Sequence, residues 1–78
     1  MNTALLTIDD VPSRNTPAIV DYLNRHGIQA VLFATGENVE KHYEEACYAL
    51  RHGMIVGNHS YSHPAFSSLP LVQCIEEI

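Results

Sequence analysis

The stretch "MIVGNHSYSH", residues 54–63, joins a short apolar run to a polar segment that carries two histidines four positions apart. The run "MIVG", residues 54–57, has the composition of a short buried strand. On an extended chain His59 and His63 would lie about 13 Å apart, too far to share one ion, whereas on a single turn they are neighbours. Pro64 disfavours helical geometry at His63, so His63 must end any such turn. The stretch therefore predicts a strand followed by one helical or tight turn that could present both imidazoles to one metal ion.

Two similar apolar runs precede this stretch, and helical patterns separate the three. The runs "TALLTI", residues 3–8, and "IQAVLFAT", residues 28–35, predict two further buried strands. Helices are expected at residues 16–26 and 38–52, and a third begins in "LPLVQCIEEI", residues 69–78, with Pro70 near its first turn. The order βαβαβα is typical of an α/β fold with a parallel sheet and right-handed crossovers, here as one domain over residues 1–78.

The first two helices carry capping and packing signals. Thr16 is expected as the N-cap of the first helix, with Pro17 at the first helical position. Gly27 and Gly53 are expected to stop the two helices. The apolar residues predicted to face the sheet are Ile19, Val20 and Leu23 in the first helix, and Val39, Tyr43, Ala46, Cys47 and Leu50 in the second.

Polar residues follow the first and third predicted strands. Asp9 and Asp10 end the first strand, and His59 and His63 follow the third. Because the carboxyl ends of parallel strands meet at one edge of a sheet, the four side chains could meet on one face. Of two adjacent carboxylates, one can bind a metal ion while the other holds a water molecule against it. Two alternatives stay open: the aspartates could serve only to form a turn, and the histidines could be ordinary loop residues.

Composition and charge exclude several classes of function. The chain has 78 residues, a net charge of −5 and only four Lys and Arg residues, which argues against a nucleic-acid or anionic-membrane surface. No apolar run is long enough to span a membrane, and the first residues do not resemble a secretory leader. The single cysteines Cys47 and Cys74 do not indicate a disulfide framework. These features together predict a cytoplasmic location.

Three segments of the sequence resemble the polysaccharide deacetylases, also called the NodB-homology or carbohydrate esterase family 4 domain. They are "LTIDDVPS", residues 6–13, "QAVLFATGENV", residues 29–39, and "HGMIVGNHSYSHP", residues 52–64. The first is similar to the family motif T-F-D-D-G-P and the last contains H-[ST]-x-x-H. The resemblance runs from residue 3 to residue 78, including the "EI" at the end of the third helix.

The resemblance implies a fold, a reaction and roles for four residues. Asp9 would be the general base, and Asp10, His59 and His63 would bind Zn²⁺, or Co²⁺ or Ni²⁺ in some members. The reaction would remove acetyl groups from an N-acetylated or O-acetylated carbohydrate, a sugar polymer or oligomer. The chain would form the first part of an irregular (β/α) barrel, incomplete here because such barrels typically run to about 250 residues.

The sequence also departs from the family pattern. Val11 stands where the family has glycine, which matters if the turn there needs a positive φ. The motifs expected later in the family are absent, including the Leu-x-His that supplies the acid histidine. His26, His42 and His52 lie on or beside helices and are not expected to replace it.

These departures lead to two further expectations. Activity of the chain alone should be low. Because an incomplete sheet exposes strand edges and apolar faces, the chain should also form a homo-oligomer or lack a C-terminal partner segment.

The sequence is also compatible with three other interpretations. The chain could hydrolyse other non-peptide C–N bonds, such as those of amides and cyclic ureides. It could be a non-enzymatic module for metal binding or assembly, which would take up Zn²⁺ without releasing acetate. It could also be an inert fragment with no stable metal site.

Overall fold

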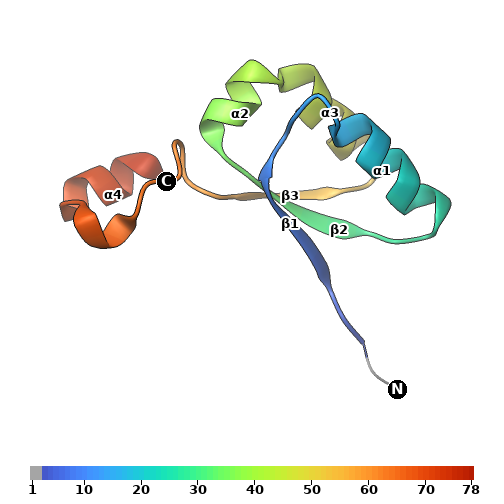
Figure 1. The fold of residues 1–78 in the computed structure, drawn as a ribbon, viewed down its shortest axis with the longest axis horizontal. Helices are drawn as coiled ribbons and strands as arrows, with labels where there is room; N and C mark the ends of the chain where they lie inside the picture. Colours follow the sequence, from blue (N-terminus) through green and yellow to red (C-terminus); the bar gives the residue numbers. More distant parts are fainter. Residues whose placement is uncertain (1–2) are drawn as a thin grey trace.

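A parallel three-stranded sheet in the order β1-β2-β3 organises the chain, with helices between successive strands. The structure is a computed structural model that describes residues 3–78. Figure 1 shows the sheet, the helices above it and a last helix set apart at the end of the chain. The elements are β1 (Leu6–Val11), α1 (Thr16–Arg25), β2 (Ala30–Ala34), α2 (Gly36–Lys41), α3 (Tyr43–Arg51), β3 (Ile55–Asn58), a 3₁₀ turn η1 (Phe66–Ser68) and α4 (Leu71–Glu77).

The predicted order of elements is confirmed, but the first strand lies later than expected. The sequence predicts a strand over residues 3–8, whereas pairing with β2 begins at Leu6 and continues through the two aspartates to Val11. The aspartates therefore belong to the strand itself and do not follow it. The other two predicted strands, 28–35 and 54–57, form at residues 30–34 and 55–58.

Helices α1, α2 and α3 cover one face of the sheet, as Figure 1 shows. Both right-handed crossovers step in the same direction along the sheet, which places their helices on the same side. The buried apolar residues between the two layers are Val11, Val20, Leu23, Ala30, Leu32, Ala34, Ala49 and Met54. The central strand β2 provides three of these, because it has a neighbouring strand on each side.

The opposite face of the sheet carries no helix in the part of the chain that the structure describes. Phe33 lies beside Gly57 there, where an added Cβ would come within 2.8 Å of the Phe33 ring. Ile55, which pairs with Val31 on this face, is 51% exposed. The expected apolar surface is thus present, and the oligomer predicted from it stays a prediction.

Two details of the predicted helices are wrong. The N-cap of α1 is Asn15, and Thr16 is the first helical residue, with its hydroxyl accepting a hydrogen bond from the Ser13 N–H at 2.8 Å. The single helix expected at 38–52 is two helices, because the backbone of His42 leaves helical geometry at φ −132° and ψ 50°.

The break at His42 changes which face of α3 is buried. Ala46 and Ala49 are buried, whereas Tyr43 and Leu50, both expected to face the sheet, are 63% and 57% exposed. Small alanine side chains let α3 lie close to the sheet. In α1, Val20 and Leu23 are buried as predicted, and Ile19 is partly exposed.

Helix α4 begins directly after Pro70, close to the predicted start, and lies beyond the carboxyl ends of the strands (Figure 1). Its residues Leu71, Val72 and Ile75 are exposed. No helix in residues 3–78 is long and apolar enough to cross a membrane. Cys47 and Cys74 are both free, in agreement with the absence of a disulfide framework.

The core gives a first prediction. Leu32 is 2% exposed in the central strand, so Leu32→Ala should remove buried apolar contacts and lower the free energy of unfolding by about 2–5 kcal/mol. Leu50→Ala is the matched control, since Leu50 is 57% exposed and its loss should change stability by about 0.5 kcal/mol or less. Urea denaturation followed by circular dichroism measures both. Equal unfolding midpoints for the two variants would contradict this assignment of the core.

Candidate metal centre

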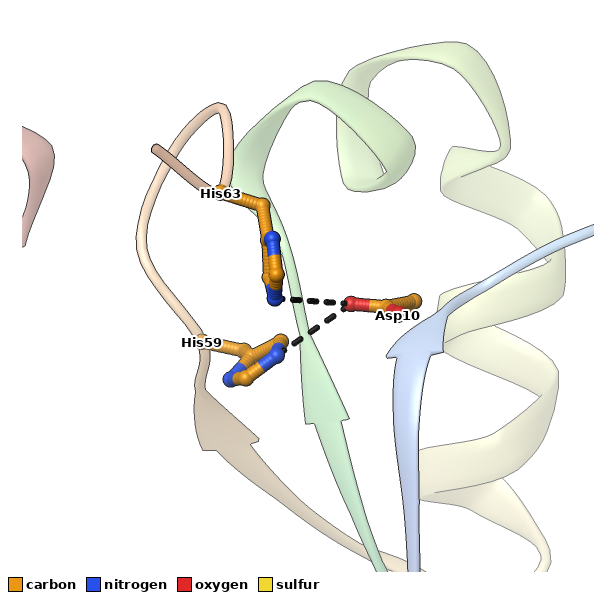
Figure 2. Close-up of side chains that lie close together, drawn as sticks. All are labelled: Asp10, His59 and His63. Carbon is orange, nitrogen blue, oxygen red and sulfur yellow. Dashed lines mark ion pairs between the residues drawn. The ribbon is translucent and has the colours of Figure 1, made fainter. Parts of the chain in front are cut away.

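Three side chains from two segments of the chain meet at the carboxyl edge of the sheet. Asp10 comes from the end of β1, and His59 and His63 come from the loop after β3, as Figure 2 shows. Asp10 Oδ1 lies 3.2 Å from His59 Nε2 and 3.6 Å from His63 Nε2. One ligand atom from each of the three residues lies within 4.8 Å of the others. The predicted meeting of the first and third strand ends is therefore present in the geometry.

A bulge in β1 directs Asp10 toward the histidines. Asp9 pairs with Phe33 and Val11 pairs with Ala34, so Asp10 is left without a partner in the ladder. Asp10 has a φ of 63°, in the left-handed region that aspartate tolerates better than most residues. Bulges of this kind re-aim a side chain beside a functional site.

The position of this bulge shows whether Val11 must adopt a positive φ in place of the glycine of the family motif. The positive φ falls on Asp10 and not on Val11, which is buried in the core. A β-branched residue at position 11 therefore causes no strain of that kind.

The loop after β3 forms a tight turn that is not helical. The His59 N–H donates to the Ala34 carbonyl at 2.9 Å, which fixes the start of the loop on β2. Asn58 Oδ1 accepts from the Ser60 N–H at 2.8 Å, and Ser60 Oγ accepts from the His63 N–H at 2.9 Å. Ser60 and His63 both have positive φ values, 65° and 60°. Of the two geometries that the sequence allows, the structure has the tight turn.

Helix α2 supports the same loop from one side. The Gly36 and Glu37 N–H groups donate to the carbonyls of Ser60 and Tyr61, each at 3.0 Å. The Tyr61 ring lies against Gly36 so closely that a Cβ there would come within 2.5 Å of it. The Tyr61 hydroxyl donates to the Glu40 carboxylate at 3.0 Å, and this hydrogen bond raises the pKa of Tyr61. Residue 36 must therefore be glycine for the loop to lie where it does.

The donor set suits a divalent transition metal. Two imidazole nitrogens and one carboxylate oxygen leave further coordination positions open, which is typical of catalytic Zn²⁺ sites and of related metals. The side chains of Asp10 and His63 are 61% and 58% exposed, and that of His59 is 29% exposed. A hollow of about 360 Å³ beside the cluster is lined by residues that include His59, His63 and Phe66. A small ligand could therefore reach the three donors from solvent.

The remaining candidate residues lie outside the cluster. Asp9 immediately precedes Asp10 and is exposed, and its side chain makes no hydrogen bond or ion pair within residues 3–78. His42 contacts Glu45, His52 contacts the Tyr48 carbonyl, and His26 packs against the Tyr22 ring. Within residues 3–78, none of these three histidines joins the cluster.

Several residues that hold the ligands were not singled out from the sequence. Asn38 donates from Nδ2 to the Asp10 carbonyl at 3.0 Å, and Asn58 and Ser60 shape the histidine turn. Asn58 and Ser60 could have been recognised, since Asn and Ser before a tight turn commonly bond to the backbone two or three residues on. The contact of Asn38 with Asp10 joins residues 28 apart, and no local pattern indicates it.

Comparison with known proteins gives a consistent picture. The family model "Polysaccharide deacetylase" matches residues 1–78. The chain is 43% identical over 60 residues to a peptidoglycan-N-acetylglucosamine deacetylase of Bacillus cereus, covering 76% of the chain and 22% of that relative. It is 35% identical over 74 residues to the peptidoglycan-N-acetylmuramic acid deacetylase PdaC of Bacillus subtilis, covering 94% of the chain and 16% of the relative.

Solved structures resemble the chain over nearly its whole length. A family 4 carbohydrate esterase from Streptomyces lividans, in complex with acetate, has a TM-score of 0.92 and 33% identity over 96% of this chain and 39% of that one. The Bc1960 peptidoglycan N-acetylglucosamine deacetylase, in complex with 4-naphthalen-1-yl-N-oxidanyl-benzamide, has a TM-score of 0.90 and 36% identity over 95% of this chain and 35% of that one.

Two conclusions follow from these likenesses. The chain spans less than a quarter of the length of the curated relatives described above. The predicted fold, a parallel βαβαβα unit resembling part of a NodB-type (β/α) barrel, is confirmed.

The cluster gives a second prediction. Asp10→Asn keeps the size of the side chain and tolerates the same left-handed backbone, but it removes the charged ligand. Zn²⁺ affinity, measured by calorimetric titration of the 78-residue chain, should fall at least about tenfold in Asp10→Asn and in His59→Ala. His26→Ala is the control because His26 lies outside the cluster, and it should bind Zn²⁺ as the unmodified chain does. Equal affinity in all four proteins would refute the three-ligand site.

Proposed function

The chain belongs to the polysaccharide deacetylase family, and we propose that it carries the metal-binding part of a metal-dependent hydrolase that removes acetyl groups from N-acetylated carbohydrate. The observation that carries the proposal is the cluster of Asp10, His59 and His63 at the carboxyl edge of the sheet. Asp9, which precedes Asp10 in the chain, is the candidate general base. The proposed substrate is a polymer or oligomer of N-acetylated amino sugars. A carbohydrate that carries O-acetyl esters is the alternative substrate.

The chemistry of the cluster supports this reaction. A bound Zn²⁺, Co²⁺ or Ni²⁺ would polarise the acetyl carbonyl and make a water molecule more acidic. The three donors would hold the ion through two imidazole nitrogens and a single carboxylate, so a divalent ion there would keep a net positive charge that suits a developing oxyanion. The exposed position of Asp10 and His63 leaves room for a sugar chain to approach along the surface.

Asp9 is suited to take a proton from the attacking water. Because Asp9 is regularly paired in β1 and Asp10 is the bulged residue, the two adjacent carboxylates are free to take different roles. The Asp9 side chain is exposed and makes no hydrogen bond within residues 3–78, so its carboxylate is available as an acceptor. Positioned general bases contribute about 10²–10⁴-fold to rate.

The names of the relatives support the choice of substrate. Those described above include deacetylases of N-acetylglucosamine and N-acetylmuramic acid in peptidoglycan, and a chitin deacetylase of Cryptococcus neoformans is 32% identical over 73 residues. These names share the acetylated amino sugar and differ in the polymer. We therefore propose the acetylated amino sugar as the unit recognised, without choosing among polymers.

Turnover by the 78-residue chain itself should be slow. In residues 3–78 no further histidine lies in the cluster to protonate the leaving amine, since His26, His42 and His52 have partners elsewhere. The proposal is therefore best tested by ligand binding as well as by acetate release.

The third prediction uses a hydroxamate as a probe of the loaded centre. The compound 4-naphthalen-1-yl-N-oxidanyl-benzamide, bound in the structure of one relative, carries a group able to chelate a metal ion. It should bind the Zn²⁺-loaded chain and should not bind the metal-free chain or Asp10→Asn. Fluorescence titration of the naphthyl group measures this binding. Binding that does not depend on Zn²⁺ would contradict the proposal.

Acetate release separates the roles of the two aspartates. Chitin oligosaccharides incubated with the Zn²⁺-loaded chain should release acetate at a low rate, and Asp9→Asn should lower that rate about 100-fold or more while leaving Zn²⁺ affinity unchanged. Hydroxamate binding with no acetate release at any protein concentration would favour the non-enzymatic metal-binding alternative. Release from a cyclic ureide but not from an N-acetyl sugar would favour hydrolysis of other C–N bonds.

A further inference from the structure

The end of α4 contacts the loop that carries the two histidines. The Ser62 N–H donates to Glu77 Oε1 at 2.7 Å, and the Ser62 hydroxyl donates to Glu77 Oε2 at 2.8 Å. One residue on, the Ile78 carbonyl accepts from Asn58 Nδ2 at 2.9 Å. Figure 1 shows α4 beyond the carboxyl ends of the strands, beside this loop. Two segments 15 residues apart are therefore joined by both oxygens of one carboxylate.

The contact falls at a sensitive point of the loop. Ser62 immediately precedes His63, so holding the Ser62 backbone limits where the His63 ring can lie. His63 is 58% exposed, and packing therefore does little to fix its ring. A carboxylate that accepts both a backbone and a hydroxyl hydrogen bond is held in one orientation. These two donors, the backbone one first, lower the pKa of Glu77, so it is charged at neutral pH.

The other supports of the loop act on its first half. Helix α2 donates to the carbonyls of Ser60 and Tyr61, and Asn58 bonds to the Ser60 N–H. His63 is tied back to Ser60 through its own N–H. Within residues 3–78, Glu77 is the residue outside the loop that bonds to Ser62. The peptide between Tyr61 and Ser62 is therefore held at its carbonyl by α2 and at its N–H by Glu77, and Glu77 also holds the Ser62 hydroxyl.

We propose that Glu77 is a positioning residue for the metal centre: by bonding Ser62 through both carboxylate oxygens, it holds His63 in place to bind the ion with Asp10 and His59. The inference rests on the proposed function in one respect, that the three side chains bind a metal. Glu77 itself is not a ligand, and it acts through the backbone of its neighbour in the loop.

The test measures Co²⁺ binding, since the visible spectrum of Co²⁺ reports coordination geometry as well as affinity. Glu77→Ala in the 78-residue chain should weaken Co²⁺ binding about 10–100-fold, the usual effect of losing a group that orients a ligand, and should change the visible bands. Glu77→Gln should recover part of the affinity, because its amide can accept from the Ser62 N–H and donate to Ser62 Oγ. Glu76→Ala, one residue away, is the matched control and should leave both readouts unchanged.

A second variant tests whether the effect passes through Ser62. Ser62→Ala removes only the hydroxyl bond and should weaken Co²⁺ binding less than Glu77→Ala does. In the double variant, the Ser62→Ala change should add nothing to the Glu77→Ala loss, because its partner has already gone. Losses that multiply, or a Glu77→Ala chain with unchanged affinity and spectrum, would overturn the proposal.

Amide hydrogen exchange separates failure of this inference from failure of the metal site. The Ser62 amide should exchange more slowly in the metal-free chain than in metal-free Glu77→Ala, while the amides of β2 exchange alike in both and show that the variant is folded. If the unmodified chain binds no Co²⁺ but Ser62 is protected by Glu77, the proposed function is wrong and the positioning of the loop by Glu77 stands. Equal exchange of Ser62 in the two proteins would overturn the inference, whatever metal binding shows.

Discussion

The left-handed backbone of Asp10, at a bulge in β1, is the local distortion on which the candidate metal centre depends. In a regular strand, successive side chains point to opposite faces. Without the bulge, the side chains of residues 9 and 10 would therefore lie on opposite faces of the sheet. The bulge removes residue 10 from the ladder and lets its carboxylate lie within 3.2–3.6 Å of two imidazoles on the far side of β2. Val11 then returns to the ladder and to the core, so the distortion is confined to one residue.

Parallel pairing makes this local distortion useful. The sheet order β1-β2-β3 separates Asp10 from the histidines by the width of one strand, and the parallel direction places all three strand ends at one edge. An antiparallel β3 would end at the opposite edge and carry its loop away from Asp10. Both crossovers pass over the same face of the sheet, so helices α1, α2 and α3 lie on that face and do not cover the carboxyl edge. Helix α2 begins there and bonds to the histidine loop.

The sequence was sufficient for the order of elements and for singling out the three residues that meet at the sheet edge, because both can be recognised from local patterns. Apolar runs, glycine stops and Pro70 locate the strands and helices, and the family motifs single out Asp10, His59 and His63. The break at His42 could not be predicted, since the apolar spacing continues across it and the choice depends on how α3 packs its alanines against the sheet. The extension of β1 through the aspartates was also missed. An apolar run that ends in two charged residues predicts the end of a strand. The pairing of β1 with β2 nevertheless continues past these residues, because β2 still offers Phe33 and Ala34 as partners.

The supports of the site were missed for a different reason, which follows from its exposure. Buried ligands are held by packing, and packing residues are recognisable as apolar. Here two of the three ligand side chains are more than half exposed, so their positions must be fixed by hydrogen bonds from polar residues that look like ordinary surface residues. Asn38 bonds to the Asp10 carbonyl, α2 bonds to the carbonyls of Ser60 and Tyr61, and Glu77 bonds to the Ser62 N–H and hydroxyl. The order of this candidate metal centre therefore depends on a polar network, and single polar substitutions around it should act more strongly on metal affinity than on the stability of the fold.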